Sequence, residues 1–163
     1  MRLFLVYLFV NQYYRFCGMA IRFSVQNRDF KLPNETNLRK WVSAVIVRRG
    51  GQVGNINYLF CDDEYLLDVN QRYLNHDTYT DIITFDYVVA NLISGDIMIS
   101  IERVGENATL FGVSFEHELR RVIIHGVLHL LGQGDKSEAE AMEMRRQEEE
   151  ALVLWNDMFL AEQ

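Results

Sequence analysis

Two histidines four residues apart, His125 and His129, are the residues of this chain best suited to chemistry. A helix completes a turn in about 3.6 residues, so the two imidazoles would share one helix face and could hold one metal ion. We expect the helix to end at Gly132, which can adopt the left-handed conformation, so that the chain returns Asp135 toward both histidines. Two imidazoles and a carboxylate leave one position of a tetrahedral zinc ion open, where a catalytic zinc activates water.

The residue after the first histidine narrows this chemistry. In zinc peptidases that position of the His-Glu-x-x-His helix carries a glutamate, which is the general base. Here it is Gly126, so a metalloprotease lacks its base and is the weaker alternative. A structural alternative is that both histidines are ordinary residues of a partly buried helix. Spacing and turn chemistry alone leave the metal site and this structural alternative open.

Three ordered motifs lie at residues 80–85, 95–100 and 124–132. They resemble those of the YbeY family, the metal-dependent endoribonucleases of bacterial ribosomal RNA maturation. Residues 124–132, which read Ile-His-Gly-Val-Leu-His-Leu-Leu-Gly, resemble the family signature. Upstream, residues 80–85 resemble its Thr-Asp-Val-Leu-Ser-Phe strand, and residues 95–100 resemble its Gly-Asp-Ile strand. Together the three are far more specific than any one motif, and the resemblance covers roughly residues 19–155.

The resemblance implies a fold, a cofactor and a function. The implied fold is that of a YbeY-like metal-dependent hydrolase, an α+β domain with a single small mixed sheet covered by helices. One zinc ion, or another divalent transition-metal ion, would be held by His125, His129 and Asp135. The implied activity is single-strand-specific cleavage of ribosomal RNA, including processing of the 16S rRNA 3′ end and ribosome quality control. Small ribosomal subunit proteins are the implied protein partners.

Two positions depart from the family pattern. The family usually has a third histidine where this chain has Asp135, and aspartate remains a competent, more anionic zinc ligand. The family also usually has an arginine at the position of Leu74, where it could clamp a phosphate. Arg72 lies two residues earlier and is one candidate substitute.

The loop before the third expected strand falls, by resemblance, in the active-site cleft of the family. His76, Asp77 and Thr80 are therefore expected to contact substrate together with Arg72. The alternative for the loop residues is an ordinary turn in which their side chains satisfy backbone groups. Thr80 and Asp81 could also cap the strand or support a ligating histidine from behind.

The acidic net charge of the chain is unfavourable for the binding of nucleic acid. The net charge is −7, and residues 1–18 contain Arg2 and Arg15 but no acidic residue, so the remainder is two units more negative still. Acidic proteins attract nucleic acid poorly, so a local basic surface would have to steer RNA. The candidates are Arg39, Lys40, Arg48, Arg49, Arg72, Arg120 and Arg121. Charge and Leu74 both support the alternative of a non-catalytic ribosome-assembly or RNA-binding factor with a structural metal.

Length and composition predict one domain. The chain has 163 residues, of which 49% are apolar. A single domain formed by residues 19–163 can therefore bury a core without disulfides. Cys17 and Cys61 are too few for a disulfide framework, which favours a reduced, cytoplasmic setting. No apolar run reaches the roughly 20 residues that span a bilayer. Residues 1–18 are interpreted as an N-terminal extension, from an upstream start codon or a signal-like segment without a cleavage site.

Alternating apolar patterns predict the elements that position the motifs. Strands are expected at residues 21–26, 52–61, 82–88 and 96–100. Helices are expected at 34–49, with Asn34 as its cap, at 62–74, at 114–131 and at 137–155, with a capping box at Ser137 and Glu140. A short helical turn is expected from Ile101, and Tyr73 and Leu74 are expected to be buried. Strands concentrated in the first half, with helices before and after, favour an α+β domain.

Overall fold

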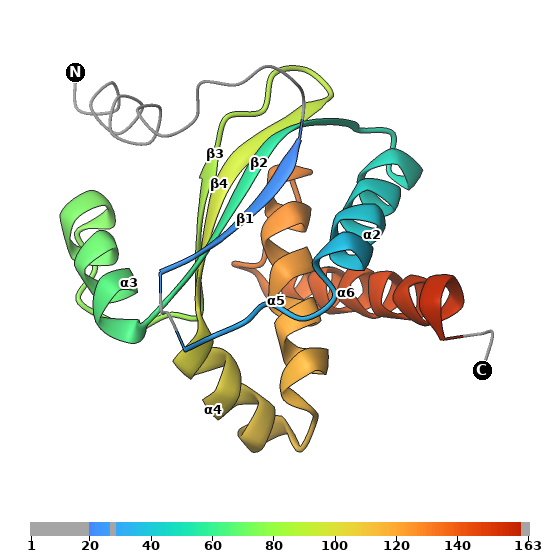
Figure 1. Ribbon diagram of the computed structural model, residues 1–163. Helices are drawn as coiled ribbons and strands as arrows, with labels where there is room; N and C mark the ends of the chain where they lie inside the picture. The colour runs from blue at the N-terminus through green and yellow to red at the C-terminus, as the bar shows by residue number, and fades with distance from the viewer. Residues whose placement is uncertain (1–19, 27–28, 161–163) are drawn as a thin grey trace.

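One mixed four-stranded sheet organises the computed structural model, which describes residues 20–26 and 29–160 (Figure 1). Its strands are β1 (Ile21–Val25), β2 (Gln52–Cys61), β3 (Ile82–Asp86) and β4 (Leu92–Ser100), in the order β1-β2-β4-β3. β1 and β4 both pair with β2 in parallel, and β3 pairs with β4 antiparallel. The expected extension, residues 1–18, lies outside the described residues.

Helices cover both faces of this sheet. Helices α2 (Glu35–Arg48), α5 (Phe115–Leu130) and α6 (Glu138–Phe159) lie on one face, and α3 (Asp63–Val69) lies on the other (Figure 1). Helix α4 (Ile101–Phe111) follows β4 directly and packs beside α5. This arrangement confirms the expected α+β fold, with a single mixed sheet covered by helices.

Alternation along the strands divides the core between the two faces. On β2, Ile56, Tyr58 and Phe60 are fully buried in the main core, toward α2, α5 and α6. Cys61 lies in a smaller cluster, which Leu66 of α3 also joins. Successive side chains of a strand point to opposite faces, so a sheet buried on both sides needs such apolar runs.

Two glycines allow α5 to lie close to the sheet. A Cβ atom at Gly126 would stand 2.9 Å from the Ile82 side chain and 3.0 Å from that of Ile97. A Cβ atom at Gly95 of β4 would stand 2.6 Å from the Phe85 carbonyl oxygen and 2.7 Å from Leu130 near the end of α5. Glycine at both positions therefore allows α5, the helix that contains His125 and His129, to pack at a short distance from the sheet.

The ends of the motif helix follow from local chemistry. The Ser114 hydroxyl accepts a hydrogen bond from the His117 amide at the N-terminus of α5. After the helix, Gly132 has a φ of +90°, the left-handed conformation that the sequence predicted. The predicted capping box at Ser137 and Glu140 is present and begins α6. The segment between α5 and α6 is thus a short, defined turn.

Several element predictions require correction. The short helical turn expected from Ile101 is a longer helix of 11 residues, α4, which the Ser100 side chain caps by accepting a hydrogen bond from the Arg103 amide. Strand β4 begins at Leu92 and α6 continues to Phe159, because packing against neighbouring elements extends both. Asn34 occupies the first position before α2, but its side chain makes no capping hydrogen bond.

The expected burial of Tyr73 and Leu74 is also wrong. Helix α3 ends at Val69, and a π-helical turn, Asn70–Leu74, follows it. The wider turn rotates later side chains off the buried face, so Tyr73 and Leu74 are both exposed. Within the described residues, no helix combines the length and apolar character needed to span a membrane.

Candidate metal centre and adjoining grooves

His125, His129 and Asp135 converge at the C-terminal end of α5. The two Nε2 atoms lie 2.9 Å apart. Asp135 Oδ2 lies 3.7 Å from Nε2 of His125 and 3.5 Å from Nε2 of His129. The histidines are partly buried and the aspartate is exposed, so the trio opens toward solvent.

The hydrogen bonds behind the histidines fix which ring nitrogens carry protons. His125 Nδ1 lies 2.6 Å from Glu148 Oε1, and His129 Nδ1 lies 2.9 Å from the Gln133 carbonyl oxygen. A carbonyl oxygen only accepts, and so does an ionised carboxylate, so each Nδ1 is the donor and carries the proton. In its neutral form, each ring then presents a bare lone pair at Nε2. Two lone pairs and a carboxylate oxygen face one point, an arrangement that a cation satisfies.

Glu148 is held in place by Arg121, which lies one turn before His125 on α5. Glu148 is 5% exposed, and Arg121 Nη1 donates to its Oε1 over 3.2 Å. The same guanidinium donates through Nε and Nη2 to both carboxylate oxygens of buried Glu118, over 2.9 and 2.6 Å. Its Nη2 also lies 3.6 Å from Asp81 Oδ2. One arginine therefore orients the acid that orients His125.

The electrostatics of Arg121 follow from these acids. Burial alone would lower the pKa of the guanidinium, but the hydrogen bond to Glu118 and the charges of Glu148, Glu118 and Asp81 raise the pKa above its ordinary value. Arg121 therefore remains charged, and its hydrogen bond to Glu148 holds that carboxylate behind His125. Its neighbour Arg120 lies over the Trp155 ring at 4.9 Å. Neither arginine is a freely solvated cation.

A groove of about 630 Å³ adjoins the trio on the His129 side. One wall is the loop and strand from Asn70 to Asp86, and the other carries His129 and Lys136. We call this the β3 groove. Of the residues expected to contact substrate, His76 and Thr80 line it, and so does Leu74.

Two further expected contacts have partners of their own. Arg72 Nε lies 2.7 Å from Asp68 Oδ1, one helical turn away. Asp77 accepts a hydrogen bond from Gln71 over 2.6 Å. Neither Arg72 nor Asp77 is among the described residues that line the β3 groove. Thr80 donates to the Ile82 carbonyl oxygen over 3.2 Å and so fixes the start of β3.

A second groove, of about 530 Å³, adjoins the trio at His125 and Asp135. His125 and Asp135 line it together with His117, Arg145 and Glu148. His117 lies two turns before His125 on α5 and is not part of the trio. The metal centre is thus bordered by two grooves.

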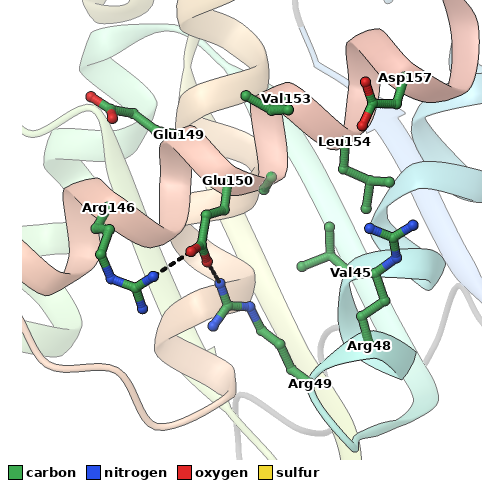
Figure 2. A pocket seen from close by; sticks show the side chains of 10 residues that line it. Val45, Arg48, Arg49, Arg146, Glu149, Glu150, Val153, Leu154 and Asp157 are labelled. Atoms are coloured by element: carbon green, nitrogen blue, oxygen red, sulfur yellow. Dashed lines mark hydrogen bonds and ion pairs between the residues drawn. The ribbon is translucent and has the colours of Figure 1, made fainter.

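Figure 2 shows another groove, of about 670 Å³, between α2 and α6. Glu150 lies between Arg49 and Arg146 and forms an ion pair with each of them. Arg49 also donates to Gln147 over 2.7 Å. None of the described residues lining this groove belongs to the trio, and the basic candidate Arg49 is already paired.

Glu148 is the site residue that the motifs do not contain. It lies 23 positions from His125, within a run of three glutamates on a charged helix. One signal could have identified it. Met144, Ala151, Leu152 and Trp155 form the buried stripe of α6, and position 148 falls within that stripe. A carboxylate among buried apolar positions needs a partner, which here is Arg121 together with His125.

Fold and site together describe an α+β domain whose candidate metal centre, of two histidines and a carboxylate, opens to a groove. A sequence model described as Endoribonuclease YbeY matches residues 22–156. The chain therefore belongs to the YbeY endoribonuclease family, as its motifs indicated.

Relatives from several bacteria share most of their length with this chain. The Endoribonuclease YbeY of Flavobacterium psychrophilum is 56% identical over 128 residues, which cover 78% of this chain and 91% of the relative. That of Christiangramia forsetii is 49% identical over 136 residues, covering 83% and 94%. The solution structure of TM1509 from Thermotoga maritima has a TM-score of 0.58 at 26% identity, covering 85% of this chain and 93% of that one. The two structures share the fold.

Proposed function

We propose that this chain is a zinc-dependent, single-strand-specific endoribonuclease that acts in the cytoplasm on ribosomal RNA. Its proposed roles are maturation of the 16S rRNA 3′ end and ribosome quality control, with small ribosomal subunit proteins as partners. Family membership supports endonucleolytic cleavage of RNA. The convergence of His125, His129 and Asp135 is the observation that carries the metal-dependent part of the proposal.

The donor set fits zinc. Ligands of a tetrahedral zinc ion bound at 2.0–2.1 Å stand about 3.3 Å apart. The three separations here, 2.9, 3.5 and 3.7 Å, lie on both sides of that distance. Two nitrogens and one oxygen are also ligand types that zinc binds in hydrolases. Zinc held there would supply Lewis acidity, which makes water a better nucleophile near neutral pH and stabilises charge on a phosphate oxygen.

The residues of the chain orient this chemistry. Glu148 accepts the Nδ1 proton of His125, and the Gln133 carbonyl oxygen accepts that of His129, so neither ring can rotate without losing a hydrogen bond. Lys136 lines the β3 groove, and its side chain forms no ion pair with any residue that the structure describes. We assign Lys136 to the substrate phosphate, since Leu74 stands where the family usually has arginine. His76 and Thr80 are proposed as further substrate contacts.

Two alternatives to an endoribonuclease are a ribosome-assembly factor and a metalloprotease. In the assembly-factor alternative, the metal would be structural and RNA would bind without being cut. The metalloprotease alternative requires a general base at position 126, but Gly126 is buried against the sheet and a longer side chain there would meet Ile82 and Ile97. The peptidase mechanism therefore has no place for its base.

Metal content and RNA cleavage test the proposal together. We expect elemental analysis of the full chain to find about one zinc per molecule, and we expect His125→Ala and Asp135→Ala to lose both the zinc and the cleavage of structured ribosomal RNA. A parent protein that takes up no metal under metal-replete conditions would contradict the metal centre. Bound zinc without cleavage would favour the assembly factor. Mapping the 3′ ends of precursor 16S rRNA after digestion tests the proposed maturation role.

A further inference from the structure

Tyr79 is an exposed aromatic side chain on the wall of the β3 groove. It is 53% exposed, although it lies in an ordered loop directly before β3. Asn70 donates to the Thr78 carbonyl oxygen over 2.8 Å, and Thr80 is bonded to Ile82, so the backbone is anchored on both sides of Tyr79. An aromatic ring held on the wall of a groove beside a candidate active centre offers a face on which a planar group of a ligand can stack.

One side of the Tyr79 ring already carries a planar partner. The guanidinium carbon of Arg103 lies 4.7 Å from the ring centroid. Arg103 is itself fixed, because its Nε donates to Asp63 over 2.8 Å and its Nη1 donates to Glu106 over 2.9 Å. The ring is thus held in one orientation before any ligand arrives, which lowers the entropy cost of stacking on it.

Leu74 provides a second apolar surface in the same groove. It is 42% exposed and ends the π-helical turn, where Asn75 adopts a φ of 56° and turns the chain. An arginine at this position would make the groove a phosphate clamp, whereas leucine makes it more apolar. Tyr79, Leu74 and His129 line one groove, so this apolar surface adjoins the metal centre.

We propose that Tyr79 and Leu74 form a nucleobase subsite that takes one unpaired base of the RNA substrate next to the cleavage position. This inference rests on the proposed function and assigns its preference for single strands to named side chains. A base in a duplex is stacked on both faces and paired along its Watson–Crick edge, so neither face is available to Tyr79. Stacking also suits a chain with a net charge of −7, in which attraction to phosphates is weak.

A fluorescent RNA tests the subsite. The probe is an unstructured, 2′-O-methylated RNA of mixed sequence that carries 2-aminopurine, whose emission falls when it stacks. It is titrated into the zinc-loaded full chain, and anisotropy and emission are both recorded. We expect Tyr79→Ala to weaken binding roughly 5- to 150-fold and to abolish the quenching, because that is the effect of losing one stacked base. Tyr79→Phe keeps the ring and should retain both signals.

The controls separate stacking from a general loss of structure. Tyr65 of α3 is also exposed but is not among the described residues of the β3 groove, so Tyr65→Ala should bind as the parent does. Leu74→Ala should weaken binding in the same direction as Tyr79→Ala. The parent should prefer the single strand to a duplex of the same sequence, and Tyr79→Ala should reduce that preference.

Each contrary outcome points to a different error. If Tyr79→Ala binds with the affinity and quenching of a parent that cleaves RNA, the subsite is refuted and the proposed function stands. If the zinc-loaded parent neither binds nor cleaves RNA, the proposed function fails and the subsite fails with it.

Discussion

Replacing Glu148 with glutamine should weaken zinc binding without removing a ligand. Glu148→Gln keeps the size of the side chain but removes the charge that accepts the His125 Nδ1 proton over 2.6 Å. Glu148 Oε1 accepts from both His125 Nδ1 and Arg121 Nη1, so glutamine keeps these two hydrogen bonds, without the charge, only when its amide oxygen occupies that position. In the other orientation it donates to Nδ1, and the Nε2 proton of the resulting tautomer blocks the metal.

The size of the effect follows from burial. Glu148 is 5% exposed, so water cannot replace the lost acceptor. Loss of such a partner behind a ligating histidine typically lowers metal affinity about 10- to 100-fold, or roughly 1.4 to 2.7 kcal/mol. The fold should survive, because Arg121 keeps both of its hydrogen bonds to Glu118.

Competition with a chromophoric chelator measures this affinity directly. Glu149→Gln is the matched control, since Glu149 is the exposed neighbour on the same helix and makes no contact with His125 among the described residues. The control should bind zinc as the parent does. Equal zinc affinities for the parent and Glu148→Gln, with both proteins folded, would refute the tautomer argument.

Three other predictions follow from single positions. Gly126→Ala should lower the free energy of unfolding, measured in urea titrations, by up to ~2 kcal/mol. Overpacking against the sheet costs ~1–3 kcal/mol, and the higher helix propensity of alanine offsets about 1 kcal/mol of that cost. Lys136→Gln should weaken RNA binding and reduce the slope of log K against log salt by about 0.7, the share of one phosphate contact on a single strand. Asp96→Asn should be more stable relative to the parent at pH 7 than at pH 4. Burial raises the pKa of Asp96, and hydrogen bonds from Asn57 and Tyr87 offset this only in part, so the stabilisation present in the protonated parent is lost as pH rises through the folded pKa.

Each of these predictions has an opposite outcome that would count against it. A Gly126→Ala protein more stable than the parent by about 1 kcal/mol, the full gain in helix propensity, would mean that α5 can move away from the sheet without cost. A salt slope unchanged in Lys136→Gln, or equally reduced in the exposed control Lys40→Gln, would remove the phosphate contact. A stability difference between the parent and Asp96→Asn that does not vary with pH would contradict the burial argument.

Local chemistry made the motif helix and its turn predictable. Serine before the helix, glycine after it and histidines at helical spacing each act within a few residues, so the sequence locates them well. Strand β2 was likewise predicted at Gln52–Cys61, because its alternation is long and glycines precede it.

Longer-range packing explains what the sequence did not reveal. Helix α4 contains Gly105, Asn107 and Thr109, which are weak helix formers, and it is held by burial of Val104 and Ala108 beside α5. The contact of Glu148 with His125 joins two different helices, and only the packing of α6 on α5 brings the residues together. The exposed Tyr79 ring was similarly unpredictable, since its partner Arg103 lies on α4.

The position of Glu148 near the end of the chain has a consequence for incomplete translation products. All three candidate ligands lie before α6 begins, so a polypeptide that stops after Lys136 contains the whole motif. It lacks the carboxylate that sets the His125 tautomer, and it exposes the face of α5 that α6 buries. Such a fragment would retain the recognisable signature and bind metal poorly. A chain therefore needs α6, in addition to the motif, to hold the His125 ring in the tautomer and orientation that can bind metal.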